Sequence, residues 1–512
     1  MQESTFTRNE KIALGVIALG CFLLHLITNL TGAYGFFRDE LYYIACSEHL
    51  SWGYVDQPPF SLFLLKFSRL IFGDSLPAIR IVPVLMHTGT VIITGLMVKE
   101  MGGKLFAIFI ASLAIALSPI HLGMSLIYSM NSIDSFLWAL SVLLILKIIN
   151  TKKQSYWIWL GILLGIGLLN KISVLFLGFG IFVGLILTNR QWFTTRWPYL
   201  AGGIAFILFA PYIVWNMTND YAHLEFINNA SSSKYSGLNA MSFIKSQLTF
   251  LNPVSTPLWI AGLLALFFYA PFKEHRIVAW IYITAFAILI INGTSKGEYL
   301  APAYASLFAA AGVFFEQKLT SPKVKWLRYG YPILIMISAS FLIPLVLPVL
   351  SVEKFISYSK KLGIEPSSNE GKELSDLPQF YADMFGWKEK AKDVAAVYNT
   401  LSKDDKEKCA IISSNYGRCG AIDFFGEQYG LPKSIGTHNN YWIWGPRDYI
   451  GEVLIILGGT LEDHVNDFES VVPAGVSTCN HCMPYENNVN IFICRGLKHK
   501  IAEVWPYEKH YD

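Results

Sequence analysis

The chain has 512 residues, of which 53% are apolar and only 15% are charged, against about 25% charged residues in soluble proteins. Its 40 basic and 37 acidic residues leave a formal charge of +3, which is too near neutrality for a nucleic-acid-binding protein. The mean hydropathy is +0.41. Because a hydrocarbon core about 30 Å thick needs roughly 20 apolar residues per helix, these values predict a polytopic membrane protein. They exclude a disordered chain and an ordinary cytosolic enzyme.

Apolar runs predict about eleven transmembrane helices, so the membrane region is expected to be all-α. The expected spans are Ile12–Thr31, Ile81–Val98, Leu105–Ser118, Ser132–Leu146, Ser155–Leu169, Ile172–Leu187, Trp197–Met217, Val254–Ala270, Ile277–Asn292, Tyr299–Phe315 and Tyr329–Leu350. The first run has no small-residue cleavage site before the extended segment 32–37. We therefore expect it to be a retained helix and not a removed signal peptide.

The distribution of Lys and Arg predicts the orientation, because short cytoplasmic loops carry the excess of positive charge. An N-terminus in the cytoplasm places these residues in cytoplasmic connections: Arg8, Lys11, Lys99, Lys104, Lys152, Lys153, Arg190, Arg196, Lys273, Arg276, Lys318, Lys323, Lys325 and Arg328. With eleven spans, the first loop (32–80), the loop 218–253 and everything after residue 351 are then periplasmic. We expect a multi-pass protein of the inner membrane, an orientation that depends on an odd number of spans.

Composition changes near Ser351, where apolar runs give way to charged sequence rich in Asn and Gly. The change predicts a membrane domain at 1–350 and a small soluble α/β domain at 351–512. Short apolar runs predict strands, and longer mixed runs predict helices. The expected strands are Cys409–Ser413, Val453–Leu457 and Asn490–Cys494, and the expected helices are Asp383–Leu401 and Gly420–Tyr429.

Cysteine usage leaves two interpretations open in this second domain. Cys479, Cys482 and Cys494, with His481 between the first two, have residue types that bind zinc. One Cys-x-x-Cys pair is a weak metal signal, however, and an oxidising periplasm permits disulfides. We favour disulfides or free thiols over a zinc site.

The first periplasmic loop opens with Arg38, Asp39 and Glu40, directly after the first span. Carboxylates at headgroup depth are partly desolvated and lie within reach of a lipid-linked substrate. Two consecutive acids cannot share one helix face, so we expect only one of them to do chemistry. The alternative is a solvated interfacial helix in which Arg38 and Glu40 pair locally.

Four further polar residues lie at the periplasmic ends of predicted helices. Asn131 and Asp134 are one turn apart at the start of the fourth span, Lys171 follows the fifth, and Lys296 precedes the tenth. Each of them alone is explained as a helix-end marker, with Asp134 at a helix N-terminus and the lysines snorkelling. Their location on the same side as the acidic loop favours a shared site.

This combination suits sugar transfer from a polyprenyl phosphate. Phosphate is a good leaving group, so the reaction needs one base for the acceptor hydroxyl and cations for the departing phosphate. A single carboxylate base without a nucleophilic partner implies inversion at the sugar carbon. One alternative function is a transporter or flippase that moves a lipid-linked sugar without bond chemistry. No cofactor is required, and a divalent cation on Asp39, Glu40 and Asp134 is an open alternative.

The sequence also resembles a known family. An Asp-Glu pair followed by Tyr-Tyr, then Asp56-Gln57-Pro58-Pro59, the Asn/Asp motif before the fourth span and the stretch Gly167-Leu168-Leu169-Asn170-Lys171 are similar to bacterial glycosyltransferase family 39. This is the protein O-mannosyltransferase and lipid A aminoarabinose transferase branch of the polytopic, C-type glycosyltransferases. The tail resembles a subgroup with an appended periplasmic domain. One tail segment, 438–446, is dense in aromatic and amide side chains, which suits either sugar recognition or docking on the membrane domain.

The resemblance implies a C-type glycosyltransferase fold and a polyprenyl-phosphate sugar as donor. The acceptor would be a lipid such as lipid A, a surface glycan or a protein. Asp39 would be the catalytic base, with Glu40 beside it. Substrate binding would fall to Arg38, Tyr42, Asp56, Gln57, Asn131, Asp134, Lys171, Lys296 and Tyr299, of which Lys171, Lys296 and Tyr299 would lie near the lipid phosphate. Gln57 departs from the His that relatives often have, so no acid–base role is carried to that position.

Overall fold

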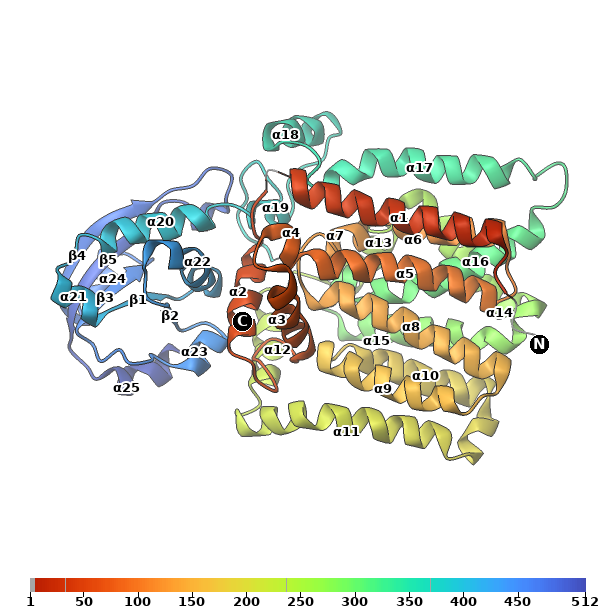
Figure 1. The fold of residues 1–512 in the computed structure, drawn as a ribbon, viewed down its shortest axis with the longest axis horizontal. Helices are drawn as coiled ribbons and strands as arrows, with labels where there is room; N and C mark the ends of the chain where they lie inside the picture. Colours follow the sequence, from red (N-terminus) through yellow and green to blue (C-terminus); the bar gives the residue numbers. More distant parts are fainter. Residues whose placement is uncertain (1–4, 33, 236, 369) are drawn as a thin grey trace.

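The structure is a computed structural model that describes residues 5–32, 34–235, 237–368 and 370–512. Ala33 of the first loop, Ser236 of the loop 218–253 and Asn369 of the C-terminal part lie outside the described residues. A bundle of long helices occupies one end of the molecule and a sheet with flanking helices the other (Figure 1). Short helices of the chain's loops, among them α2 (Arg38–Glu48) and α3 (Phe60–Phe72), fill the region between the two parts.

The prediction of a mostly helical membrane region is confirmed, since each of the eleven predicted spans is an apolar helix. Among the described residues, seven helices are long and apolar enough to cross a membrane, and one bent pair makes an eighth. The long spans are α1 (Arg8–Thr31), α5 (Ile81–Glu100), α8 (Met130–Thr151), α11 (Trp197–Thr218), α15 (Arg276–Asn292) with its preceding turn, α16 (Tyr304–Lys318) with its preceding turn, and α17 (Leu327–Val346). The bent pair is α13 (Ala240–Thr249) with α14 (Thr256–Phe268) and its preceding turn, and three shorter apolar helices are α6 (Leu105–Ala116), α9 (Ser155–Asn170) and α10 (Val174–Thr188).

Small residues allow the central helices to approach closely, as is common inside membranes. A Cβ on Gly312 of α16 would lie 2.6 Å from the carbonyl oxygen of Ala107 on α6, so glycine is required at this contact. In contrast, α11 and α17 at the edge of the bundle are only 17% buried over their apolar windows. Their exposed apolar faces are suited to lipid.

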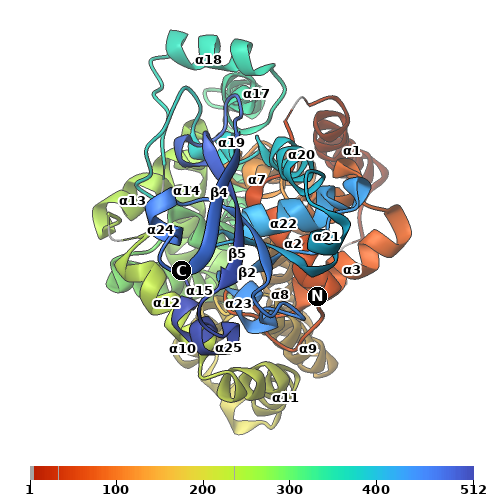
Figure 2. The same cartoon turned by 90° about the vertical axis from the view of Figure 1, so that its left-hand side faces the viewer.

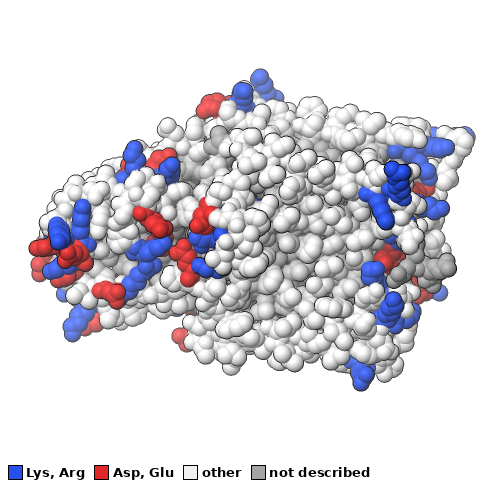
Figure 3. All heavy atoms as spheres, viewed as in Figure 1, with Lys and Arg blue, Asp and Glu red and all other residues white. Residues whose placement is uncertain are grey.

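Charge is distributed unevenly along the molecule (Figure 3). Lys and Arg gather at the end of the bundle far from the sheet, and the belt between this end and the sheet domain is almost free of charge on the visible face. The predicted orientation depends on this pattern and places the basic end in the cytoplasm. The orientation itself stays a prediction.

The C-terminal part contains a five-stranded sheet, in the order β2-β1-β3-β5-β4 within the described residues. The strands are β1 (Cys409–Ser413), β2 (Ile435–Gly436), β3 (Val453–Leu457), β4 (Phe468–Ser477) and β5 (Val489–Leu497). β1 pairs in parallel with β2 and β3, whereas β5 runs antiparallel to both β3 and β4. Seen from the side of this domain, β4 and β5 lie in front of the bundle (Figure 2).

In this part, the two predicted helices begin at residues different from those at which the observed helices begin. Gly386 has φ +88° and caps α20 (Trp387–Tyr398), which therefore begins after the predicted Asp383. Asn415 caps α22 (Tyr416–Phe425) by accepting from the Gly417 and Arg418 amides, so this helix begins before the predicted Gly420. The edge strand β4 was not predicted, because most of its residues are exposed and Pro473 and Gly475 interrupt it at a bulge. The remaining helices are α18 (Val352–Lys361), α19 (Gln379–Ala382), α21 (Lys403–Lys408), α23 (Asn440–Trp444), α24 (Leu461–His464) and α25 (Ile501–Val504).

The two parts meet through the first loop. A Cβ on Gly420 of α22 would lie 2.8 Å from the carbonyl carbon of Leu41 in α2, so the two helices are in direct contact. The last residues of the chain return to the same junction: Lys509 pairs with Glu225 at 2.8 Å, and the carbonyl of Tyr511 accepts from Asn229 at 2.7 Å. The sheet domain therefore contacts two long loops of the membrane region, the first loop and the loop 218–253.

The cysteines form one disulfide among the described residues, between Cys479 and Cys482. Cys494 lies on β5 with its thiol fully buried, and His481 between the paired cysteines has φ +66°. This outcome agrees with the favoured interpretation of disulfides and free thiols.

Candidate active site

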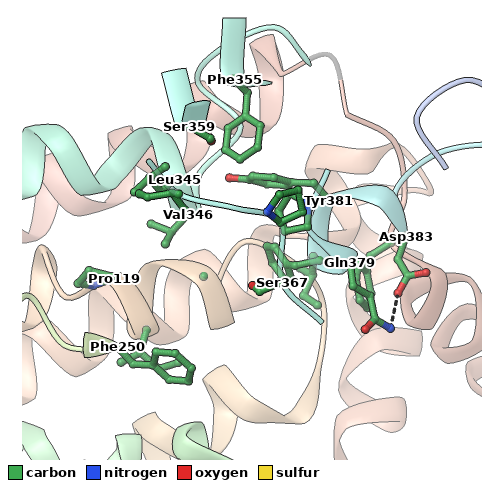
Figure 4. Close-up of a pocket in the computed structure, with 18 of the residues that line it drawn as sticks. Pro119, Phe250, Leu345, Val346, Phe355, Ser359, Ser367, Gln379, Tyr381 and Asp383 are labelled. Atoms are coloured by element: carbon green, nitrogen blue, oxygen red, sulfur yellow. Dashed lines mark hydrogen bonds between the residues drawn. The ribbon is translucent and has the colours of Figure 1, made fainter. Parts of the chain in front are cut away.

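A cavity of about 760 Å³ connects the membrane helices to the junction with the C-terminal part. One side is apolar and is lined by residues such as Pro119, Ile120, Phe250, Leu345 and Val346, and the other side is polar (Figure 4). The polar side is lined by Arg38, Asp39, Asn131, Lys296, Glu298, Glu370 and Asp383. Such a cavity can hold an amphiphile with a long apolar chain and a charged head.

Asp39 lies in the first turn of α2 and faces this cavity. Its carboxylate accepts hydrogen bonds from the hydroxyl of Tyr416 at 2.8 Å and from Nε of Arg38 at 3.2 Å. Both of these bonds fall on Oδ1 among the described residues, and the side chain is 37% exposed. Asp39 is thus held in place through one oxygen while the carboxylate stays accessible.

Glu40, its neighbour, points away from the cavity and is fully buried. It forms two charged hydrogen bonds with Arg80, at 2.9 and 2.8 Å, and also accepts from the backbone amides of Phe37 and Tyr128. The bond from Phe37 caps α2 itself, and the other three join α2 to the start of α5 and to the segment before α8. The expectation that only one of the two acids faces the site agrees with this geometry, and the local Arg38–Glu40 pair does not form. The predicted catalytic role of Glu40 stays a prediction, and its buried contacts suit a residue that positions α2.

Arg38 lies at the centre of a buried charged cluster at the polar side of the cavity. Besides Asp39, it contacts Glu370 and Asp383, each at 3.6 Å, and donates to the Tyr485 hydroxyl at 3.1 Å. Burial raises the pKa of Asp383 to about 7, with Arg38 opposing the rise. Burial also opposes ionisation of Glu370, but Arg38 and Lys234 outweigh it and lower the pKa of Glu370 to about 2. Glu370 and Asp383 come from the C-terminal part, and no motif in the sequence pointed to Glu370.

Asn131 lines the same cavity, and Lys171 and Tyr299 lie next to it. Nζ of Lys171 donates to Oδ1 of Asn131 at 2.8 Å and lies 4.9 Å from the centre of the Tyr299 ring. Asp134 is buried next to them and accepts from Ser173 at 3.3 Å. Burial lowers the pKa of Lys171 below its usual value, although the carboxylates of Asp134 and Glu298 oppose this effect.

Lys296 lines the cavity and lies 4.5 Å from the ring centre of Tyr235, on the loop 218–253. Burial disfavours its charge, but Glu298 and Tyr235 outweigh burial and keep the pKa of Lys296 above its usual value. Lys234 is a cation that the sequence did not predict for the site. Burial lowers its pKa, and the nearby carboxylates of Glu370 and Asp512 oppose this change. Its loop contains no motif that would have identified it.

Tyr42, Asp56 and Gln57 do not line the cavity, but Tyr42 packs on Tyr416 behind Asp39, with ring centres 4.8 Å apart. The Tyr42 hydroxyl is 3.0 Å from Oδ1 of Asp56 and 3.1 Å from Oδ1 of Asn440, and the Val55 amide donates to the same Asn440 oxygen at 2.8 Å. The Gln57 side chain is fully buried, and its polar atoms have no partner among the described residues. These contacts join the first loop to α23, so they favour a structural role over substrate contact for Tyr42 and Gln57. Burial raises the pKa of Asp56 to about 6.

Aromatic and imidazole rings of the C-terminal part also lie behind Asp39. The ring of His438 packs on Tyr416 with centres 4.6 Å apart, and Nε2 of His438 lies 2.8 Å from Oδ1 of Asp512. His510 lies 3.1 Å from the same oxygen, so these three residues bring together ligand types that could hold a metal ion. The sequence singled out the segments containing Tyr416 and His438 but did not place them beside Asp39.

Comparison with known proteins bears directly on this arrangement. Residues 56–215 match the family described as dolichyl-phosphate-mannose-protein mannosyltransferase. The lipid A galacturonosyltransferase RgtD of Rhizobium johnstonii is 22% identical over 243 residues, which are 47% of this chain and 51% of that protein. The match therefore spans about half the length of the relative. The expected resemblance to glycosyltransferase family 39 is confirmed by these matches.

Solved structures of known proteins share the fold of this chain. ArnT from Cupriavidus metallidurans in the apo state superposes with a TM-score of 0.61 at 11% identity, covering 94% of this chain and 97% of that one. The same protein bound to undecaprenyl phosphate gives a TM-score of 0.59 with the same identity and coverage. The C-type glycosyltransferase fold with a small C-terminal α/β part, predicted from the resemblance, is confirmed.

Proposed function

We propose that this protein is an inverting glycosyltransferase that moves a sugar from a polyprenyl-phosphate donor to an acceptor at the periplasmic face of the inner membrane. The observation that carries the proposal is the cavity of about 760 Å³, which joins apolar membrane helices to Asp39, Arg38 and Lys296. The names of the relatives support it, since RgtD is a lipid A galacturonosyltransferase and ArnT has been solved with undecaprenyl phosphate. Domain 1–350 would carry the reaction, and domain 351–512 would close the site from the periplasm.

The donor's polyprenyl chain would pass from the bilayer to the apolar side of the cavity. Its phosphate would then reach the polar side, where Arg38 and Lys296 line the cavity and Lys171 lies behind Asn131. Cations placed where negative charge develops are the main means of stabilising such a transition state.

Asp39 would act as the base for the acceptor. Tyr416 and Arg38 engage its Oδ1, so Oδ2 is the oxygen that we assign to the acceptor hydroxyl. The hydroxyl oxygen forms a bond to the anomeric carbon as its proton passes to Asp39, and the bond from that carbon to the phosphate oxygen breaks. The electron pair stays on the phosphate, which leaves as polyprenyl phosphate, and attack from the opposite side inverts the anomeric carbon.

The experiment compares a deletion strain with its complemented forms, because this comparison finds the transferred sugar whatever its identity. Mass spectra of lipid A, surface glycans and envelope proteins should lack one sugar in the deletion strain, and the wild-type gene should restore it. The variant Asp39→Asn should reduce the modification by at least a hundredfold, because a general base contributes about 10²–10⁴ to the rate. Glu48→Gln at the far end of α2 is the matched control, since Glu48 pairs with Arg69 and Lys433 outside the cavity.

Two outcomes would overturn the proposal. If Asp39→Asn restores the sugar as well as the wild type does, Asp39 is not the base. If the purified full-length protein moves undecaprenyl-phosphate-linked sugars across liposome membranes but the deletion strain keeps every sugar, the chain is a transporter.

A further inference from the structure

A second cluster of reactive side chains lies inside the helical bundle, apart from the proposed active site. Cys21 and His25 are one turn apart on α1, and His87 faces them from α5. All three are buried, with exposed fractions of 4%, 0% and 2%. Nδ1 of His87 lies 3.5 Å from Sγ of Cys21 and 2.9 Å from Nε2 of His25, so three donor atoms converge on one point.

Nε2 of His87, the ring nitrogen that faces away from the cluster, forms a hydrogen bond of the kind found in metal-binding histidines. Its Nε2 lies 3.1 Å from the backbone carbonyl oxygen of Ile115, and a carbonyl can only accept, so this nitrogen carries the proton. The lone pair of a neutral His87 ring is then on Nδ1 and points toward Cys21 and His25. Histidines that bind metals usually donate their other N–H to a backbone carbonyl or a carboxylate, which fixes the tautomer.

The spacing of the donor atoms is close to that of a small coordination sphere. With metal–nitrogen bonds of about 2.0 Å and a metal–sulfur bond of about 2.3 Å, neighbouring ligand atoms are separated by about 3.3–3.6 Å. The Cys21–His87 separation of 3.5 Å lies in this range. The His25–His87 separation of 2.9 Å would have to open by about half an ångström, which a small rotation of one side chain provides.

The softness of the ligand atoms and the net charge of the buried site decide which ion fits. A thiolate with two imidazoles prefers copper or zinc over the hard cations Mg²⁺ and Ca²⁺. Net charge buried between helices is costly, and one thiolate neutralises a monovalent ion but leaves a divalent ion with a charge of +1. We propose that Cys21, His25 and His87 form an intramembrane binding site for a soft monovalent cation, Cu(I). The sulfur–copper bond replaces the thiol proton, so one proton is released for each ion that binds.

The buried face of α1 is polar between the cluster and the end of the helix at Thr31, where Thr28 and Asn29 lie. On the other side, Leu14, Ile17 and Ala18 separate the cluster from the buried pair of Glu10 and Lys99. His25 is six residues from Thr31, about 9 Å along the helix axis. In the predicted orientation this polar side is periplasmic, so the ion would enter from the periplasm.

The test uses the full-length protein in detergent, stripped of metal and kept anaerobic, with Cu(I) titrated against the chromophoric chelator bicinchoninate. We expect one retained equivalent per chain, and X-ray absorption should find one sulfur and two nitrogen neighbours around copper. Cys21→Ser and His25→Gln should each weaken binding by at least tenfold. Cys409→Ser is the matched control, because this half-buried thiol on β1 lies outside the cluster and its loss should leave the binding unchanged.

Several results would overturn the proposal. Absence of a retained equivalent in the wild type removes the site, and retention of Zn(II) but not Cu(I) removes the choice of ion. If Cys21→Ser does not fold, the absorption spectrum of the wild type still decides, because a copper ion without a sulfur neighbour contradicts the assignment. Equal loss of binding in Cys409→Ser would place the ion elsewhere.

Discussion

The hydroxyl of Tyr416 donates a hydrogen bond of 2.8 Å to Oδ1 of Asp39, and this bond connects the C-terminal domain to the proposed base. A hydrogen bond to a charged group contributes about 1.5–3 kcal/mol. We expect Tyr416→Phe to lower kcat by about tenfold to a hundredfold, because the carboxylate loses the contact that holds its orientation. KM for the donor should change little, since Tyr416 is not among the residues that line the cavity.

Steady-state kinetics with purified protein check this expectation, and Tyr398→Phe is the control. Tyr398 lies on α20 of the same domain and donates to the Lys406 carbonyl, at 3.4 Å. A kcat of Tyr416→Phe equal to that of Tyr398→Phe would mean that the bond plays no part in catalysis.

The buried pair of Glu40 and Arg80 leads to a prediction about stability. Both side chains are almost fully buried, and they form two hydrogen bonds of 2.8 and 2.9 Å. Removing one partner leaves an uncompensated buried charge, which costs about 3–5 kcal/mol. We therefore expect Arg80→Met to lower the thermal unfolding temperature in detergent by many degrees.

The comparison is with Glu452→Gln, which breaks the exposed Lys408–Glu452 pair on the C-terminal part. An exposed pair contributes about 1 kcal/mol or less, so this variant should unfold close to the wild type. Similar unfolding temperatures for the two variants would contradict the structural role of Glu40.

The raised pKa of Asp56 predicts that the stability of the folded protein depends on pH. Burial raises its pKa from 3.8 to about 6, so the folded state binds more protons than the unfolded state between these values. Stability therefore falls as pH rises from about 4 to 6 and stays lower above that range. Asp56→Asn keeps an acceptor for the Tyr42 hydroxyl and removes the buried charge. We expect it to be more stable than the wild type at pH 8, by at most about 3 kcal/mol, and equal to it near pH 4.

Thermal unfolding of both proteins at several pH values measures this difference directly. Asp423 is also buried and its pKa is also raised, so Asp423→Asn removes a second carboxylate of the same kind. This substitution also weakens the hydrogen bonds that Asp423 accepts from Ser434. A difference between Asp56→Asn and the wild type that does not change between pH 4 and 8 would show that Asp56 does not titrate in this range.

The sequence predicted the helical bundle well, because membrane spans depend on local composition. The residue pattern alone could not decide between Asp39 and Glu40, and only the resemblance favoured Asp39. The helix period showed that they point about 100° apart, but the side that faces the cavity depends on Arg80, which is forty residues away and contacts Glu40. Pairing between distant residues leaves no local pattern.

The same limit explains the other residues that were missed. Lys234 and Glu370 lie in irregular segments, and only the folded chain brings Glu370 to Arg38 and the charge of Lys234 near Glu370. Tyr416 lay within a segment noted for its resemblance, yet its part in the site depends on how α22 docks on α2. The predicted strands were those with buried residues, and the mostly exposed β4 had no apolar run to identify it.

The apolar side of the cavity leads to a last prediction. Gly123 on α7 (Pro119–Met124) lines the cavity, and a Cβ added there would meet no atom within 4 Å, so a larger side chain can grow into the space assigned to the lipid. We expect Gly123→Leu to fold normally and to raise KM for a donor with an eleven-isoprene chain by about tenfold. A donor with a two-isoprene chain, which does not need the full length of the cavity, should be affected much less. Gly203→Leu on the exposed face of α11 is the control, since a Cβ there also meets no neighbour but lies outside the cavity. If both variants raise KM for both donors equally, the lipid does not occupy this cavity, because only a bound chain makes the effect depend on its length.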